Sequence, residues 1–454
     1  MARALWFLFV LGLLVIAAVW LADNPGSVTL HWQDYRLDTS VALLLVAVAL
    51  IAAAAAAAYR LWRFIRRAPA SLSRAGRERR RRRGYLALTQ GLVAVAAGDA
   101  EEARHQVKRA DGLLDDPPLT LLLSAQAAQL AGDEGTGGKY FAAMLDRPET
   151  EFLGLRGLLI QAIKRGDRNE ALGLARRAYG LKPKSAWVAS NLFALQTGAG
   201  LWADAETTLA RSVKNNLVEA AEGRHRRAVL AYQRSLEAGK RERGAEALKR
   251  VRAAHDLDPG FIPAAVRLAR LLIGAGRARK AAAVIEDTWS RAPHPDLLDV
   301  YWAARGAADG LEKVQAAERL AKFNPDHVES HLAMAAAALE APLWGEARKH
   351  LEAAGGTDPS ARVCRLMAAL EESEHENMAR AHEWLMRASV AERDPAWVCE
   401  HCGNAVAQWS ALCGKCDGFD SFAWRMPPRV AVLAAGGPGT PAPAALPAAP
   451  ARAE

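Results

Sequence analysis

Two long apolar runs open the chain, at residues 4–22 and 41–58, and neither contains a charged residue. A helix rises 1.5 Å per residue, so about 20 apolar residues are enough to cross a bilayer. The second run continues into Tyr59 and Trp62, aromatic residues that favour the membrane interface. The pattern therefore predicts a two-helix transmembrane hairpin over residues 1–65, with helices at about 4–22 and 41–62.

A cleaved signal peptide is the alternative for the first run. No small-x-small cleavage site precedes the sequence DNPG, and a second apolar run follows closely. We therefore expect a retained helix, joined to the second by a short loop in which Asn24-Pro25-Gly26 signals a turn.

From residue 84 to 395 the apolar positions follow a helical period, and no alternating strand pattern persists. Prolines recur at intervals of 34, 32, 34 and 36 residues, at Pro259, Pro293, Pro325, Pro359 and Pro395. A period near 34 residues that ends in proline resembles the tetratricopeptide repeat, in which each unit is a pair of antiparallel helices.

Small residues stand where paired helices approach each other in such units, for example Ala269, Ala281, Ala335 and Ala347. The 76 residues from Pro183 to Pro259 fit two units, the second with longer helices. Residues 84–118 and 119–150 fit degenerate units. The region 84–395 is thus predicted to be a helical solenoid.

A solenoid of this type buries each unit against its neighbours and leaves a concave surface that binds peptides or proteins. The alternative is a spacer that only separates the two ends of the chain. We favour protein binding, although the sequence does not say which residues bind.

Net charge changes the picture of the region after the second apolar run. The whole chain carries +9, while residues 60–83 alone hold eleven arginines and one glutamate, so the remainder carries −1. A near-neutral body argues against nucleic-acid binding. The positive-inside rule places residue 60 onward and the N-terminus in the cytoplasm, with the loop outside.

The arginines also suit anionic lipid headgroups, a role compatible with fixing the topology. We assign residues 66–83 to an Arg-rich juxtamembrane segment. The membrane-surface candidates are Arg60, Arg63, Arg66, Arg67, Arg79, Arg80, Arg81, Arg82 and Arg83.

Residues 396–427 contain four of the five cysteines, spaced C-x2-C-x10-C-x2-C. Two C-x-x-C turns suit one tetrahedral zinc ion, with iron as the second choice, and a cytoplasmic location argues against disulfides. The predicted ligands are Cys399, Cys402, Cys413 and Cys416. Gly403 and Gly414 are expected to ease the turns, and nearby aromatic residues to form a small core or to dock on neighbouring repeats.

Catalytic motifs fail on inspection. GAGRAR (274–279) lacks the third glycine of a dinucleotide loop, and DEGTGGKY (133–140) lacks the first glycine and the final Ser or Thr of a phosphate loop. We expect no enzyme activity and no catalytic residue. Residues 428–454, rich in Ala and Pro, are predicted to be a disordered tail.

Together the hairpin, the sequence HWQDYRLDTSV, the arginine block and the repeats resemble the bacterial HemY family. That resemblance implies an inner-membrane scaffold linked to haem (protoporphyrin) biosynthesis. The rubredoxin-like four-cysteine module instead resembles that of the lipopolysaccharide assembly protein B family. This second resemblance implies an adaptor that directs an enzyme of lipid A synthesis to a membrane protease.

The fold class expected is all-α, with a small zinc-ribbon or rubredoxin-like module near its end. Our leading hypothesis is a non-enzymatic scaffold for haem-biosynthetic enzymes, in which the module docks against the last repeats. The second is an adaptor for regulated proteolysis or envelope lipid synthesis. The third is a cryptic enzyme or haem-handling protein. The oligomeric state stays open.

Overall fold

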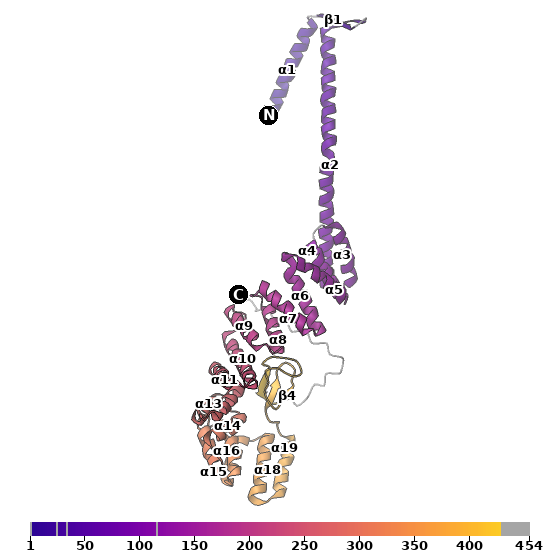
Figure 1. Cartoon of the computed structure of the whole chain (residues 1–454). Coiled ribbons are helices and arrows are strands. Elements are labelled where there is room, and N and C mark those ends of the chain that lie inside the picture. The colour runs from indigo at the N-terminus through magenta and orange to yellow at the C-terminus, as the bar shows by residue number, and fades with distance from the viewer. Residues whose placement is uncertain (1, 24–25, 33–34, 115–116, 428–454) are drawn as a thin grey trace. The chain divides into compact units, whose positions relative to one another are not determined.

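The structure is a computed structural model that describes residues 2–23, 26–32, 35–114 and 117–427 (Figure 1). It divides into two compact units, Met1–Met144 and Leu145–Glu454, and each is described by itself. The predicted disordered tail, residues 428–454, lies outside the described residues.

The first unit begins with helix α1 (Ala2–Asp23), strands β1 (Ser27–Trp32) and β2 (Tyr35–Ser40), and helix α2 (Val41–Ala97). The two strands pair antiparallel, from Ser27 opposite Ser40 to Trp32 opposite Tyr35. Our prediction of a short loop there was wrong. The two strands alternate Val28, Leu30 and Trp32, and then Tyr35, Leu37 and Thr39, with polar residues. This alternation favours a hairpin.

Helix α2 runs for 57 residues without interruption, from a Ser40 cap to Gly98, whose φ of 81° ends it. The boundaries that we predicted at residues 65/66 and 83/84 both fall inside this helix. The Arg-rich segment is therefore not a linker in the structure. Alanine and arginine are strong helix formers, so the membrane-side helix and the first repeat helix join.

Among the described residues, one helical segment, Val41–Arg63, is long and apolar enough to cross a membrane. Its large side chains are exposed, with Leu50 at 65% and Ile51 at 69%. A helix that is apolar on all sides either lies in the core of a large protein or spans a membrane. The span predicted at residues 4–22 coincides with α1, and its passage through the membrane stays a prediction.

The rest of the first unit packs the end of α2 with α3 (Ala100–Leu113), α4 (Pro117–Leu130) and α5 (Glu134–Ala143). Gly91 allows a close approach, because a Cβ there would lie 2.6 Å from the Leu123 side chain. These helices correspond to the two degenerate units predicted from the sequence.

The second unit is a succession of antiparallel helix pairs, preceded by a short 3-10 helix, η1 (Met144–Asp146). The helices are α6 (Pro148–Arg165), α7 (Arg168–Leu181), α8 (Ala186–Gly198), α9 (Trp202–Lys214), α10 (Ala220–Lys240), α11 (Gly244–Leu257), α12 (Ile262–Gly274), α13 (Ala278–Arg291), α14 (Asp296–Arg305), α15 (Gly310–Ala321), α16 (Val328–Glu340), α17 (Trp344–Gly355), α18 (Ala361–His375) and α19 (Met378–Val390).

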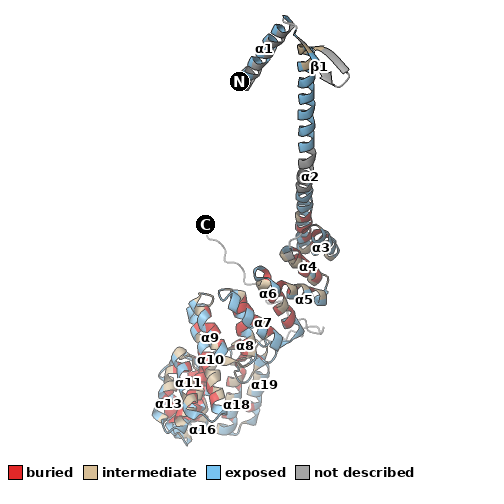
Figure 2. Cartoon of the chain, turned by 45° about the horizontal axis from the view of Figure 1, so that its top comes forward, coloured by how far each residue is buried: buried red, intermediate tan, exposed pale blue. Residues whose placement is uncertain are grey.

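The repeat pattern read from the sequence is confirmed by these pairs. Ala269, Ala281, Ala335 and Ala347 are fully buried at helix contacts. Helix α10, with 21 residues, is the lengthened helix expected before Pro259. Figure 2 shows buried residues along the helix pairs of the second unit and exposed residues along the membrane-side part of α2.

The chain ends its described part in a small antiparallel sheet of order β4-β3-β5. The strands are β3 (Ala396–Cys399), β4 (Ala405–Val406) and β5 (Phe422–Arg425). We call residues 396–427, which contain this sheet and the four cysteines, the cysteine module.

Candidate metal centre and its docking surface

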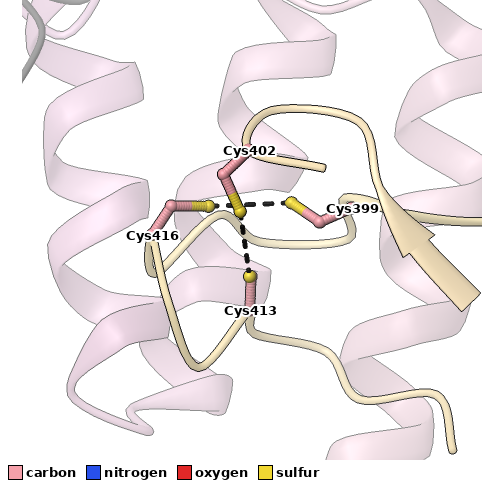
Figure 3. Close-up of side chains that lie close together, drawn as sticks. All are labelled: Cys399, Cys402, Cys413 and Cys416. Carbon is pink, nitrogen blue, oxygen red and sulfur yellow. Dashed lines mark hydrogen bonds between the residues drawn. The ribbon is translucent and has the colours of Figure 1, made fainter. Parts of the chain in front are cut away.

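The four predicted cysteines meet at one point (Figure 3). All four Sγ atoms lie within 4.8 Å of one another. Cys399 Sγ is 3.7 Å from Cys416 Sγ, and Cys402 Sγ is 3.6 Å from Cys413 Sγ. A zinc–sulfur bond of about 2.3 Å gives a tetrahedron edge of about 3.8 Å, so the arrangement fits one tetrahedral ion.

Two similar turns hold the sulfurs. In the first, the Gly403 amide donates to Cys399 O, and in the second the Asp417 amide donates to Cys413 O. Gly403 has φ of 69° and Asp417 has φ of 55°. Our prediction for Gly414 was wrong, because the left-handed position follows the second cysteine of each pair, and Asp417 occupies it.

Hydrogen bonds stabilise the thiolate form of Cys399. Burial raises the pKa of its thiol, but bonds from the Ser421 hydroxyl and from the Cys402 and His401 backbone lower that pKa to about 6. Burial and the neighbouring Cys402 sulfur raise the pKa of Cys416 to about 12. Four thiolates this close repel one another, so a bound cation is required to ionise them all.

Aromatic side chains attach the cysteine module to the solenoid. Phe419 makes an edge-to-face contact with Phe193 of α8, with ring centroids 5.2 Å apart. Trp409 lies 5.0 Å from Phe261, beside the start of α12. Trp397, Cys399 and other buried module residues belong to the same hydrophobic core as α10 to α16.

A charged contact supports the same attachment. His225 of α10 lies between two carboxylates, with Nδ1 2.6 Å from Asp258 and Nε2 3.0 Å from Asp420 of the module. Hydrogen bonds to Asp258 and Asp420 raise the pKa of His225 to about 10, although burial opposes them. A cationic imidazole therefore joins α10, the end of α11 and the module.

The docking position corrects our expectation that the module packs on the last repeats. It lies within the curve of the helical array (Figure 1), against the first helices of the middle pairs. The chain returns there because the segment after α19 is held on α18, where Asp394 accepts from the Arg362 amide and pairs with Arg365.

Sequence reasoning missed Ser421, Asp420 and His225. The aromatic residues around the cysteines indicated docking, but no local pattern connected His225 to a carboxylate so distant in the chain. Helix α5 covers most of the failed phosphate-loop match, and Asp133 caps it by accepting from the Thr136 amide. That segment is therefore an ordinary helix start.

The arginine candidates all lie on α2. Arg60, Arg63 and Arg79 to Arg83 are exposed, and Arg80 donates to Gly112 O at 2.8 Å. The side chains of Arg66 and Arg67 lie outside the described residues.

Comparison with known proteins adds a family context. Residues 26–132 match the family described as HemY protein N-terminus, and residues 235–301 match the tetratricopeptide repeat. The chain therefore resembles HemY in this part and contains tetratricopeptide repeats. The residues matched to HemY thus cover the β1–β2 hairpin, α2, α3 and α4.

The curated relatives of this chain are of two kinds. It is 29% identical over 433 residues to the probable magnetosome protein Mms48 of Magnetospirillum gryphiswaldense, which covers 93% of each chain. It is 28% identical over 126 residues to protein HemY of Escherichia coli K12, covering 28% of this chain and 32% of that protein.

Solved structures show only a loose likeness. The TPR2AB-domain:pHSP90 complex of yeast Sti1 is 13% identical with a TM-score of 0.27, covering 67% of this chain and 98% of that chain. A tetratricopeptide repeat protein of Parabacteroides merdae is 14% identical with a TM-score of 0.24, covering 61% and 93%. We draw nothing further from likeness at these scores.

Proposed function

We propose that this chain is a non-enzymatic scaffold of the bacterial inner membrane, which gathers proteins through its tetratricopeptide array and is associated with haem biosynthesis. The observation that carries the scaffold role is the array itself, whose inner face presents aromatic and charged side chains. The HemY match over residues 26–132 supports the haem context.

A cavity on that face supports partner binding. It measures about 430 Å³ and is lined by side chains from α10, α12 and α14 and by Trp409 of the module. Its lining includes Arg267, Arg270, Asp296 and Asp299. Tyr232 contacts Trp409, with ring centroids 5.7 Å apart. Aromatic residues and arginine dominate protein-binding hot spots, so a peptide segment suits this surface.

The metal of the cysteine module is proposed to be zinc, with iron as the second choice. Four sulfur ligands leave no open position, so the ion has a structural role. We predict about one zinc per chain, and Cys413→Ser should lose nearly all of it in elemental analysis. Cys364→Ser is the matched control, because Cys364 is buried in α18 away from the cluster. Equal metal content in both variants would refute the site.

For the membrane part, we propose two spans, α1 and Val41–Arg63, with both termini in the cytoplasm. The exposed arginines from Arg79 to Arg83 support this orientation and an affinity for anionic lipids. Single reporter cysteines placed in the 27–40 hairpin and after residue 100 test it in intact cells. A membrane-impermeant thiol reagent should label only the hairpin reporter.

The haem role is tested by deleting the gene and measuring porphyrins and lipid A precursors together. Accumulated or depleted porphyrins with normal lipid A precursors support the proposal. Unchanged porphyrins would remove the haem association while leaving the scaffold role intact.

A second candidate is an adaptor for regulated proteolysis or envelope lipid synthesis. The docked four-cysteine module favours it, because this combination with a tetratricopeptide array resembles lipopolysaccharide assembly protein B. Altered lipid A precursors in the same deletion would select this candidate. The similarity to a probable magnetosome protein over 93% of the chain is compatible with both the haem-associated scaffold and the adaptor.

A further inference from the structure

The cysteine module covers the part of the array that a partner would use. Phe193, Tyr232 and Phe261 line the inner face of α8, α10 and the start of α12, and each has a ring contact with Phe419 or Trp409. The contacts of the module indicate the chemistry that this face accepts, which is an aromatic ring with carboxylates beside it.

The carboxylates are placed beside the rings. Asp420 follows Phe419 and pairs with His225, while Asp417 pairs with Arg168 of α7 at 2.6 Å. Within the four residues 417–420 the module therefore offers one aromatic ring and two charges to three different helices.

These contact residues depend on the metal ligands for their positions. Trp409 lies between Cys402 and Cys413, and Phe419 and Asp420 come three and four residues after Cys416. The strands of the module contain only two to four residues each. A module of this size holds little apolar core of its own, so it loses its fold when the metal leaves.

The array does not depend on the module in the same way. The clusters around Leu155 to Leu192 and around Leu332 to Leu370 contain no module residue. The core of α10 to α16 does include module residues such as Trp397 and Phe422, but most of its members come from the helices. Each helix pair of a solenoid is stabilised by its neighbours. We therefore expect the helices to remain when the module leaves them.

We propose that the metal-loaded module is a cover for the inner face of α8, α10 and α12. Loss of the metal opens this face to partner segments that carry aromatic side chains flanked by carboxylates. The inference rests on the proposed scaffold function and adds its regulation: metal occupancy decides whether the face is free.

The test uses the full chain in detergent, loaded with zinc or stripped by a chelator, and a labelled peptide probe. The probe is DGFDSFAW, residues 417–424, which contains no cysteine. It should bind the zinc-free chain at least about tenfold more tightly, a difference of about 1.4 kcal/mol. A scrambled peptide is the control. Equal binding to both forms, or to neither, would overturn the proposal.

Opening is also measured without any probe. Zinc removal should raise amide exchange across 396–427 and increase the fluorescence of a dye that binds apolar surface, while the helical circular dichroism persists. Loss of the helical signal would identify the module as a brace and contradict the cover. These measurements test only whether the module acts as a cover. A negative result therefore does not contradict the proposed scaffold role.

A second variant separates undocking from metal loss. Trp409→Ala combined with Phe419→Ala removes the two ring anchors but retains all four cysteines. It should bind the probe even when loaded with zinc, and elemental analysis should still find the metal. The matched control is Leu385→Ala combined with Met386→Ala, which truncates two exposed apolar side chains of α19 and should stay closed. If the variant that lacks the two ring anchors retains zinc and still does not bind the probe, the proposal is wrong.

Discussion

At the scale of single residues, Gly418 shows how closely the two cysteine turns of the module pack on each other. A Cβ at this position would lie 2.6 Å from His401 Nδ1, 3.0 Å from Ser421 Oγ and 3.3 Å from Cys416 Sγ. Cys413 also donates its backbone N–H to Gly418 O. The absence of a side chain at Gly418 therefore lets the two cysteine turns approach each other.

Gly418→Ala should destabilise the module by about 1–3 kcal/mol, because the added methyl group forces its neighbours apart. The measurement is the competition of a chelator for zinc, in which the variant should release its metal at a lower chelator concentration. Gly414→Ala is the control, since a Cβ there meets nothing within 4 Å. Similar release curves for both variants would show that the space around Gly418 does not matter.

At the scale of elements, the contact between the module and α10 is sensitive to pH. The folded pKa of His225, about 10, exceeds its ordinary value of 6.5. A histidine with a raised pKa stabilises the folded form fully below pH 6.5, and this contribution is lost as pH rises through about 10. Docking should therefore weaken across this alkaline range.

The prediction concerns the difference between wild type and His225→Gln. The wild type should unfold at a higher denaturant concentration near pH 6, and the gap should shrink as pH approaches about 10. Chemical denaturation at several pH values measures it. A gap that stays constant would mean that the charge on His225 does not hold the module.

Helix pairing is the other feature at this scale. Ala281 of α13 is fully buried, whereas Ala283 two residues later is exposed. Ala281→Leu should lower the free energy of unfolding by about 1–3 kcal/mol through overpacking, while Ala283→Leu should change it little. Urea denaturation of the two variants distinguishes them, and equal midpoints would contradict the assigned helix contact.

At the scale of the whole molecule, α2 joins the candidate membrane span to the first helix pair of its unit without a break. Leu50 lies in the span, and Leu86 lies in the same helix beyond it, each with more than half of its surface exposed. The two leucines have the same chemistry and different expected surroundings.

Leu50→Arg should reduce membrane insertion, because an arginine at the centre of a span costs about 2.5–3.5 kcal/mol. Leu86→Arg should leave it unchanged. Fractionation after alkaline carbonate extraction measures the retained fraction of the full chain. Equal retention of both variants would argue that Val41–Arg63 does not lie in lipid.

What the sequence determined by itself was local and periodic. Apolar runs, a 34-residue period and the C-x2-C-x10-C-x2-C spacing predicted the apolar helix, the helix pairs and the four ligands, because each depends on residues close together in the chain. The position of the left-handed residue was misread at Gly414, because glycine adopts positive φ more readily than aspartate, yet Asp417 occupies that position.

Only the tertiary structure decided where the cysteine module lies and what fixes it. The bridge from Asp420 to His225 and the contact of Phe419 with Phe193 join segments far apart in sequence. Such contacts depend on the curvature of the whole array and on the return of the chain along α18. No periodic pattern encodes that path, and this is why the module was expected at the last repeats and lies on the middle ones.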